Sequence, residues 1–224
     1  AEAYSLLNEE LGLDDFSEFL EDETTMAKIE NLMKIRDSFN IENNPHEIAK
    51  SLAIFSAFTE GVNLFSSFAV LLSFKMRNKL KGVGQIVEWS IRDESLHSEA
   101  GCWLFRTLIE ENPELKTYEL EAAINEAALL SLKLELDFIE KVYELGDLEG
   151  CSKYELINFI KNRVNTKLGD LGYKPIIEGI DMNAVNSMKW FDALSAGKQH
   201  TDFFANRVTN YSKGHIEWDT ASMF

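Results

Sequence analysis

A glutamate and a histidine three residues apart form the first chemical signal of the chain. Glu94 and His97 lie in residues 91–97, which read IRDESLH. On a helix this spacing is a rotation of about 300°, so both side chains share one face. Glu-x-x-His on a buried helix of a bundle is typical of di-iron and di-manganese carboxylate sites. The spacing alone also fits an ordinary, partly exposed Glu–His pair.

A second carboxylate, Glu60, lies in the most apolar part of the chain, with Phe55 and Phe58 before it and Leu64 and Phe65 after it. A buried carboxylate without a partner is costly. We interpret it as a metal ligand from a neighbouring helix. The alternative is a glutamate at a polar helix edge, satisfied by arginine or water. With the Glu-x-x-His pair it makes half of the roughly six ligands that a di-metal site takes.

Helices must position these side chains, because apolar residues recur at helical spacing almost throughout the chain. The expected helices are residues 1–11, 23–39, 45–81, 85–111, 113–145, 152–168 and 183–191. Asn44 is the expected N-cap before Pro45, and residues 81–84 (KGVG) are expected to form a turn. The sequence predicts an all-α bundle with antiparallel neighbours and an extended tail over residues 208–224.

Composition excludes several other functions. The 224 residues include 38 acidic and 22 basic side chains, a net charge of −16, which argues against a nucleic-acid partner. The apolar stretch over residues 67–74 is too short to span a bilayer, so no membrane partner is expected. Cys102 and Cys151 form no Cys-x-x-Cys, and two reduced thiols in a cytoplasmic protein are the favoured interpretation.

Four segments, in this order, resemble the small, radical-generating subunit of class I ribonucleotide reductase. They are residues 3–7 (AYSLL), 60–62 (EGV) with the aromatic run after them, 91–97 (IRDESLH) and 202–211 (DFFANRVTNY). The resemblance covers the whole chain and implies a ferritin-like helical bundle. It implies a helical domain over residues 1–207, lacking its N-terminal helices, and a tail over 208–224 that docks to the large subunit.

The resemblance also implies roles for single residues. The ligands to one metal of a dinuclear iron or manganese/iron centre would be Glu60, Glu94 and His97. Tyr4 would carry the tyrosyl radical, in an apolar pocket lined by Phe68 and Leu64. Asp93 would orient a further ligand histidine and join the radical-transfer path, and Tyr211 would relay the radical. Without the resemblance, Tyr4, Asp93 and Tyr211 are a packing tyrosine, a surface charge and a surface tyrosine.

One departure from the family pattern concerns the other half of the centre. The family's remaining ligands, including a histidine four residues before Tyr4, would all precede Ala1. We therefore expect a C-terminal piece, truncated or encoded by a split gene, that works with an N-terminal segment or chain completing the site.

The expected partners are the large catalytic subunit and a second copy in a homodimer. The expected function is to generate, with O2, a tyrosyl radical used by the large subunit to make deoxyribonucleotides. The alternatives are another ferritin-like di-metal oxidase or a non-catalytic helical interaction fragment.

Overall fold

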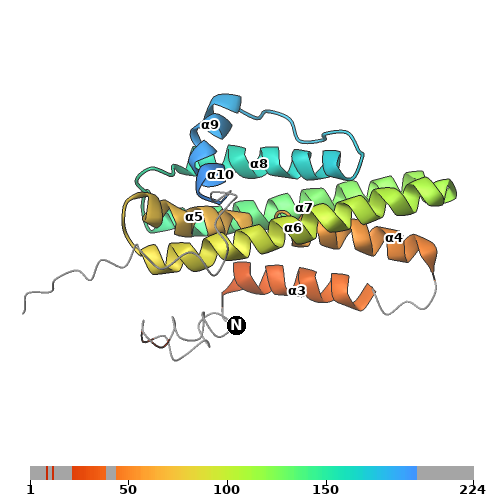
Figure 1. Cartoon of the computed structure of the whole chain (residues 1–224), viewed down its shortest axis with the longest axis horizontal. Helices are drawn as coiled ribbons and strands as arrows, with labels where there is room; N and C mark the ends of the chain where they lie inside the picture. Colours follow the sequence, from red (N-terminus) through yellow and green to blue (C-terminus); the bar gives the residue numbers. More distant parts are fainter. Residues whose placement is uncertain (1–8, 10–11, 13–21, 39–43, 196–224) are drawn as a thin grey trace, which may run out of the picture.

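The fold of the chain, in a computed structural model that describes residues 9, 12, 22–38 and 44–195, is a bundle of helices (Figure 1). These residues contain a single isolated β-bridge and no β-strand, so the all-α prediction is confirmed. The helices are α3 (Glu23–Ser38), α4 (Pro45–Ile54), α5 (Phe65–Met76), α6 (Lys81–Glu111), α7 (Tyr118–Glu144), α8 (Lys153–Asp170), α9 (Met182–Ser187) and α10 (Lys189–Ser195). A π-helix, η1 (Phe55–Thr59), follows α4, and a short 3-10 helix, η2 (Pro113–Leu115), precedes α7.

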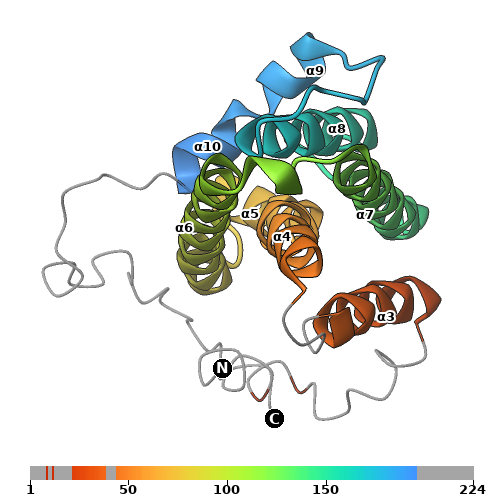
Figure 2. The same cartoon turned by 90° about the vertical axis from the view of Figure 1, so that its right-hand side faces the viewer.

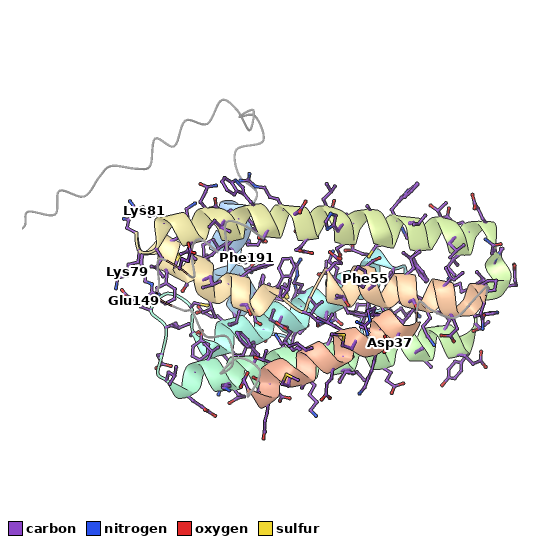
Figure 3. The ribbon with its side chains drawn as sticks, turned by 90° about the horizontal axis from the view of Figure 1, so that it is seen from below. Asp37, Phe55, Lys79, Lys81, Glu149 and Phe191 are labelled. Atoms are coloured by element: carbon purple, nitrogen blue, oxygen red, sulfur yellow. The ribbon has the colours of Figure 1, made fainter. Side chains whose placement is uncertain are left out.

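The centre of the bundle is formed by α4, η1 and α5. Viewed along the bundle, α6, α7 and α8 surround this central strip, and α3 lies outside against α4 and α7 (Figure 2). The core between them is aromatic: the Phe65 ring lies 5.5 Å from that of Phe68 and 6.0 Å from that of Phe191. Phe191 comes from α10 and is buried inside the bundle (Figure 3). The short helices α9 and α10 therefore cover one side of the core, where α9 packs on α8 and α10 packs on α5 and α6.

Local sequence signals account for several helix ends. The Asn44 side chain accepts the His46 backbone N–H at 3.1 Å, and Pro45 takes the first turn of α4, as predicted. Ser152 begins α8 with a capping box, in which its hydroxyl accepts from the Glu155 N–H and the Glu155 carboxylate accepts from the Ser152 N–H. These ends depend on residues close in sequence, so the pattern could identify them.

The structure differs from the prediction between residues 45 and 85. One continuous helix over 45–81 was expected, but η1 and a turn over residues 60–64 interrupt it. The chain reverses at residues 77–80, and α6 already begins at Lys81. Gly82 and Gly84, which the sequence predicts to lie in a turn, therefore belong to α6.

Gly84 is needed for close packing, because a Cβ there would lie 2.6 Å from the Lys75 side chain. Figure 3 shows Lys79, Lys81 and Glu149 together at this end of the bundle.

Some expectations fall on residues that the structure does not describe. Tyr4, Tyr211 and the segment 208–224 lie outside the described ranges. None of the helices described is long and apolar enough to cross a membrane. Both cysteines are free and buried.

Candidate metal centre

The three predicted ligands meet in space. Glu60, Glu94 and His97 each offer one ligand atom, and these atoms lie within 4.8 Å of one another. His97 Nδ1 is 3.4 Å from Glu60 Oε2. The Glu60 side chain is only 15% exposed, whereas that of His97 is 55% exposed. The cluster therefore has an enclosed side at Glu60 and an open side at His97.

The π-helix η1 sets the position of Glu60. The Glu60 N–H donates to the Phe55 carbonyl five residues back, at 3.0 Å, and the Asn63 N–H donates to the Phe58 carbonyl, at 2.9 Å. The Phe58 carbonyl also accepts the Val62 N–H at the ordinary four-residue spacing, at 3.1 Å. Five-residue hydrogen bonds of this kind widen the helix locally, a distortion that is frequent at functional sites. Glu60 follows η1 directly and begins the non-helical turn before α5. The helix break thus lies at the predicted ligand itself.

Small residues bring α6 close to this break. Gly101 lies seven residues after Glu94, on the same face of α6, and a Cβ there would lie 2.0 Å from Ser56 Oγ and 2.6 Å from Ser56 Cβ. A Cβ on Gly61 would lie 2.7 Å from the hydroxyl oxygen of Ser98. Glycine permits this backbone approach because it has no side chain. This close packing places the face of α6 that bears Glu94 and His97 next to Glu60.

Gly101→Ala should test this packing. The added methyl group should clash with Ser56 and destabilise the fold by about 1–3 kcal/mol, partly offset by up to about 1 kcal/mol of better helix propensity. Denaturant unfolding measures the change. Gly169→Ala in α8 is the matched control, because a Cβ there meets nothing within 4 Å, so it should be neutral or stabilising. Equal effects of the two substitutions would contradict a tight contact at Gly101.

The charges of the cluster oppose one another when no metal is present. A hydrogen bond to Glu60, burial and the negative charge of Glu60 raise the pKa of Glu94 from 4.5 to about 7. Two carboxylates sharing one site hold a proton between them for this reason. A divalent cation would remove the conflict, since it stabilises both carboxylates in their ionised forms.

This raised pKa predicts a pH dependence of the metal-free protein. Between pH 4.5 and about 7 the folded chain holds a proton on Glu94 that the unfolded chain releases. The free energy of unfolding contributed by Glu94 should therefore fall as the pH rises through this window. Denaturant unfolding in the presence of a chelator measures it. Glu94→Gln should flatten this part of the profile, and Glu99→Gln, exposed on the same helix, should keep it. A profile unchanged by Glu94→Gln would contradict the shared proton.

The donor set fits a transition-metal ion. Glu60 Oε2 is buried and makes no hydrogen bond, although His97 Nδ1 lies nearby. A buried carboxylate oxygen without a donor is costly, and a cation bound there would satisfy it. Two carboxylates and one imidazole are ligands that iron and manganese accept. Within the described residues, this is the group of histidine, cysteine, aspartate and glutamate side chains placed to hold a metal.

The other predicted site residues that the structure describes are Asp93, Phe68 and Leu64. Asp93 Oδ1 lies 3.8 Å from His97 Nε2, and its side chain is 72% exposed. Its neighbouring imidazole is thus that of His97 on the same helix. Phe68 is buried in the core, whereas Leu64 is 43% exposed.

The side chains that hold the break were not predicted from the sequence. Arg163, Lys28 and Glu135 contact the turn and the start of α5 from three other helices. A fully buried Glu135 had no visible signal, since its neighbours in the sequence are ordinary for a helix. Gly61 and Gly101 could have been noticed, because glycine inside a helical pattern often marks a close backbone approach.

The chain is similar to a known protein family over most of its length. Residues 1–183 match the family described as ribonucleotide reductase, small chain. A probable ribonucleoside-diphosphate reductase small subunit of Invertebrate iridescent virus 3 is 35% identical over 182 residues, covering 81% of this chain and 47% of that protein. The corresponding protein of Invertebrate iridescent virus 6 is 33% identical, covering 94% of this chain and 67% of its own length.

A bacterial relative and solved structures agree with these matches. The ribonucleoside-diphosphate reductase subunit beta of Chlamydia pneumoniae is 27% identical, covering 94% of this chain and 62% of that protein. This chain therefore spans about half to two thirds of the length of these relatives. The crystal structure of a putative class I ribonucleotide reductase from Bacillus halodurans superposes with a TM-score of 0.69 at 22% identity, over 80% of this chain and 62% of that one. This likeness shows a shared fold.

Proposed function

The chain belongs to the ribonucleotide reductase small-chain family, and from this premise we propose that it forms part of the metal centre of a ribonucleoside-diphosphate reductase small subunit. One observation carries the proposal: Glu60, Glu94 and His97 meet within 4.8 Å at a helix break. In this proposal the three side chains bind one ion of a dinuclear iron or manganese/iron centre. The other ligands of the pair come from outside these three residues, on this polypeptide or on a second one.

The chain's own residues divide the work between ligation and enclosure. When bound, the metal pair supplies the oxidising power, drawn from O2, for making a tyrosyl radical. Glu60 and Glu94 carry the negative charge that balances the ions, and Glu94 gives up its shared proton as a cation binds. Phe58, Phe65 and Phe68, all buried, keep water away from the enclosed side.

Tyrosines are proposed to hold and pass on the radical. Tyr4 loses an electron and a proton and keeps the unpaired electron, and Tyr211 relays it toward the large subunit. Asp93 belongs to this path, and its place beside His97, with Oδ1 3.8 Å from Nε2, is compatible with the role.

The proposed partners are the large catalytic subunit, which residues 208–224 would contact, and a second copy of the completed small subunit. The two free, buried cysteines support a reducing, cytoplasmic location.

The test combines spectroscopy with turnover. The chain, together with any segment that completes the centre, is loaded with Fe2+ and exposed to O2, and electron paramagnetic resonance is recorded. We expect a tyrosyl signal that Tyr4→Phe removes while metal content is kept. Tyr211→Phe should keep the signal and stop ribonucleotide reduction by added large subunit. A tyrosyl signal unchanged by Tyr4→Phe would reject Tyr4 as its bearer, and normal turnover in Tyr211→Phe would reject the relay.

A further inference from the structure

The turn that carries Glu60 is held from the side by an arginine. Arg163 of α8 donates from Nε to the backbone carbonyl of Gly61, the residue directly after Glu60. Its guanidinium carbon lies 3.2 Å from the centroid of the Phe65 ring, at the first position of α5. The same guanidinium group therefore touches both the turn and the helix that follows it.

This arginine is an unusual choice for a buried position. The residue keeps some exposed surface, but burial of its guanidinium group lowers its pKa to about 9, so it stays charged at neutral pH. The salt bridges found among residues 22–38 and 44–195 include none to Arg163. The negative charges of Asp192 and Asp170 favour its charged form, but burial of a cation that makes no direct ion pair is still costly. We therefore ask what the contacts of Arg163 with the Gly61 carbonyl and the Phe65 ring contribute to the site.

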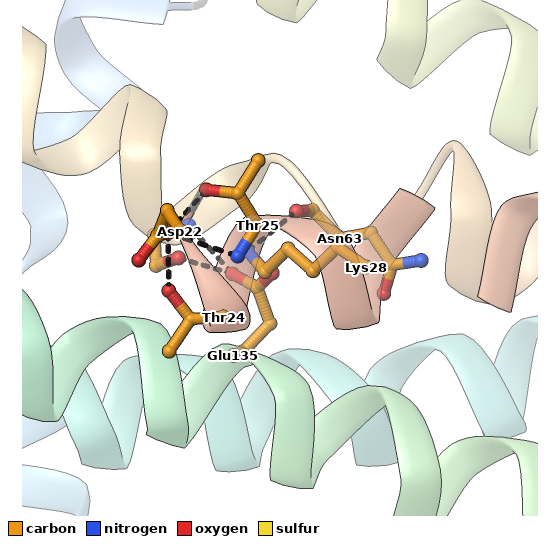
Figure 4. A network of polar contacts seen from close by, with 7 residues as sticks. Asp22, Thr24, Thr25, Lys28, Asn63 and Glu135 are labelled. Carbon is orange, nitrogen blue, oxygen red and sulfur yellow. Dashed lines mark hydrogen bonds and ion pairs between the residues drawn. The ribbon is translucent and has the colours of Figure 1, made fainter. Parts of the chain in front are cut away.

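A second set of contacts holds the far end of the same turn. Lys28 Nζ of α3 donates to the Asn63 carbonyl at 3.2 Å, and it pairs with Glu135 of α7. Glu135 Oε2 accepts the Ser66 N–H at 3.2 Å and so caps α5, which has no cap of its own at Leu64. Figure 4 shows Lys28, Asn63 and Glu135 converging at this point. Side chains of α3 and α7 thus fix the end of the turn. At Gly61, Arg163 is the one side chain that hydrogen-bonds the turn within the described residues.

We propose that Arg163 is a positioning residue of the metal centre: by holding the Gly61 carbonyl, it keeps the turn open and presents the Glu60 carboxylate to Glu94 and His97. Without this contact the wide turn can rewind toward a regular α-helix. A shift of one residue in a helix rotates a side chain by about 100°, which would turn Glu60 away from α6. The inference rests on the proposed function, because it assigns a purpose to Glu60 as a ligand.

The experiment measures binding of Mn2+ to the full chain by electron paramagnetic resonance, which counts the free ion. Arg163→Gln removes the cation, and Arg163→Lys keeps it without the planar fork. Arg106→Gln is the matched control, because Arg106 of α6 also donates to a backbone carbonyl, but to that of Asp170 and not to one in the turn. Hydrogen exchange at the amides of residues 60–66 is followed in parallel, and circular dichroism checks folding.

We expect Arg163→Gln to weaken Mn2+ binding about tenfold, the lower end of the loss when a group supporting a ligand is removed, and to speed exchange at residues 60–66. Arg163→Lys should fall between it and the unchanged chain, and decides the matter if Arg163→Gln does not fold. Arg106→Gln should bind within about twofold of the unchanged chain.

Two results would overturn the role of Arg163. If the unchanged chain binds Mn2+ and the Arg163 variants bind it equally well, the positioning role is wrong and the proposed function stands. If the unchanged chain does not bind Mn2+ even together with a segment that completes the centre, the proposed function fails, and the role of Arg163 falls with it.

Discussion

Lys28→Met is expected to destabilise the folded chain by about 3–5 kcal/mol, the cost of removing one partner from a buried ion pair. Lys28 Nζ pairs with Glu135, whose side chain has no exposed surface. Burial already raises the pKa of Glu135, and the positive charge of Lys28 is the largest opposing influence. Without Lys28, the carboxylate keeps only the N–H and hydroxyl of Ser66.

The stability lost in Lys28→Met should depend on the pH and on whether Glu135 is present. Removing Lys28 should raise the pKa of Glu135 further, so Lys28→Met should become less stable, relative to the unchanged chain, as the pH rises and Glu135 must ionise. Adding Glu135→Leu to Lys28→Met should recover much of the stability, because replacing a whole buried pair is often nearly neutral.

Denaturant unfolding of the two single variants and the double variant gives the coupling energy. Arg36→Met is the control, since Arg36 and Asp37 are 66% and 63% exposed and such pairs contribute at most about 1 kcal/mol. If Lys28→Met costs no more than Arg36→Met, the buried pair is not what attaches α3 to α7.

Glu60→Gln is expected to weaken Mn2+ binding more than about 100-fold, beyond the usual loss for a group that only supports a ligand. Glu94 and His97 lie on one helix, and Glu60 is the proposed ligand that faces them from another segment. Without its charge, the two remaining ligands bind an ion from one side only. The amide of glutamine keeps the size of the side chain, so the change reports on charge and ligation more than on packing.

Counting free Mn2+ by electron paramagnetic resonance at several metal concentrations gives the affinity. Glu99→Gln removes an exposed carboxylate two residues after His97 and should change the affinity by less than about threefold, the effect of one screened surface charge. If Glu60→Gln and Glu99→Gln have the same small effect, binding at this cluster is non-specific attraction to an acidic protein.

The sequence by itself determined the helical class, several helix ends and the residue types of the candidate metal site. Apolar spacing indicated the helices, and Asn44 and Ser152 capped theirs through neighbours two or three residues away. Glu94 and His97 share a face because of helix geometry alone. These features depend on interactions between residues close in the chain, so the sequence pattern is sufficient to predict them.

Only the tertiary structure decided where the long apolar helix breaks and how Glu60 reaches α6. The break at η1 uses five-residue hydrogen bonds that leave the same apolar pattern as an α-helix. The groups that hold it come from far along the chain: Arg163 is 102 residues from Gly61, and Lys28 is 107 residues from Glu135. Backbone groups released by a helix break must be satisfied when buried. In this chain, side chains from three other helices satisfy them, and their positions exist only once the bundle has assembled.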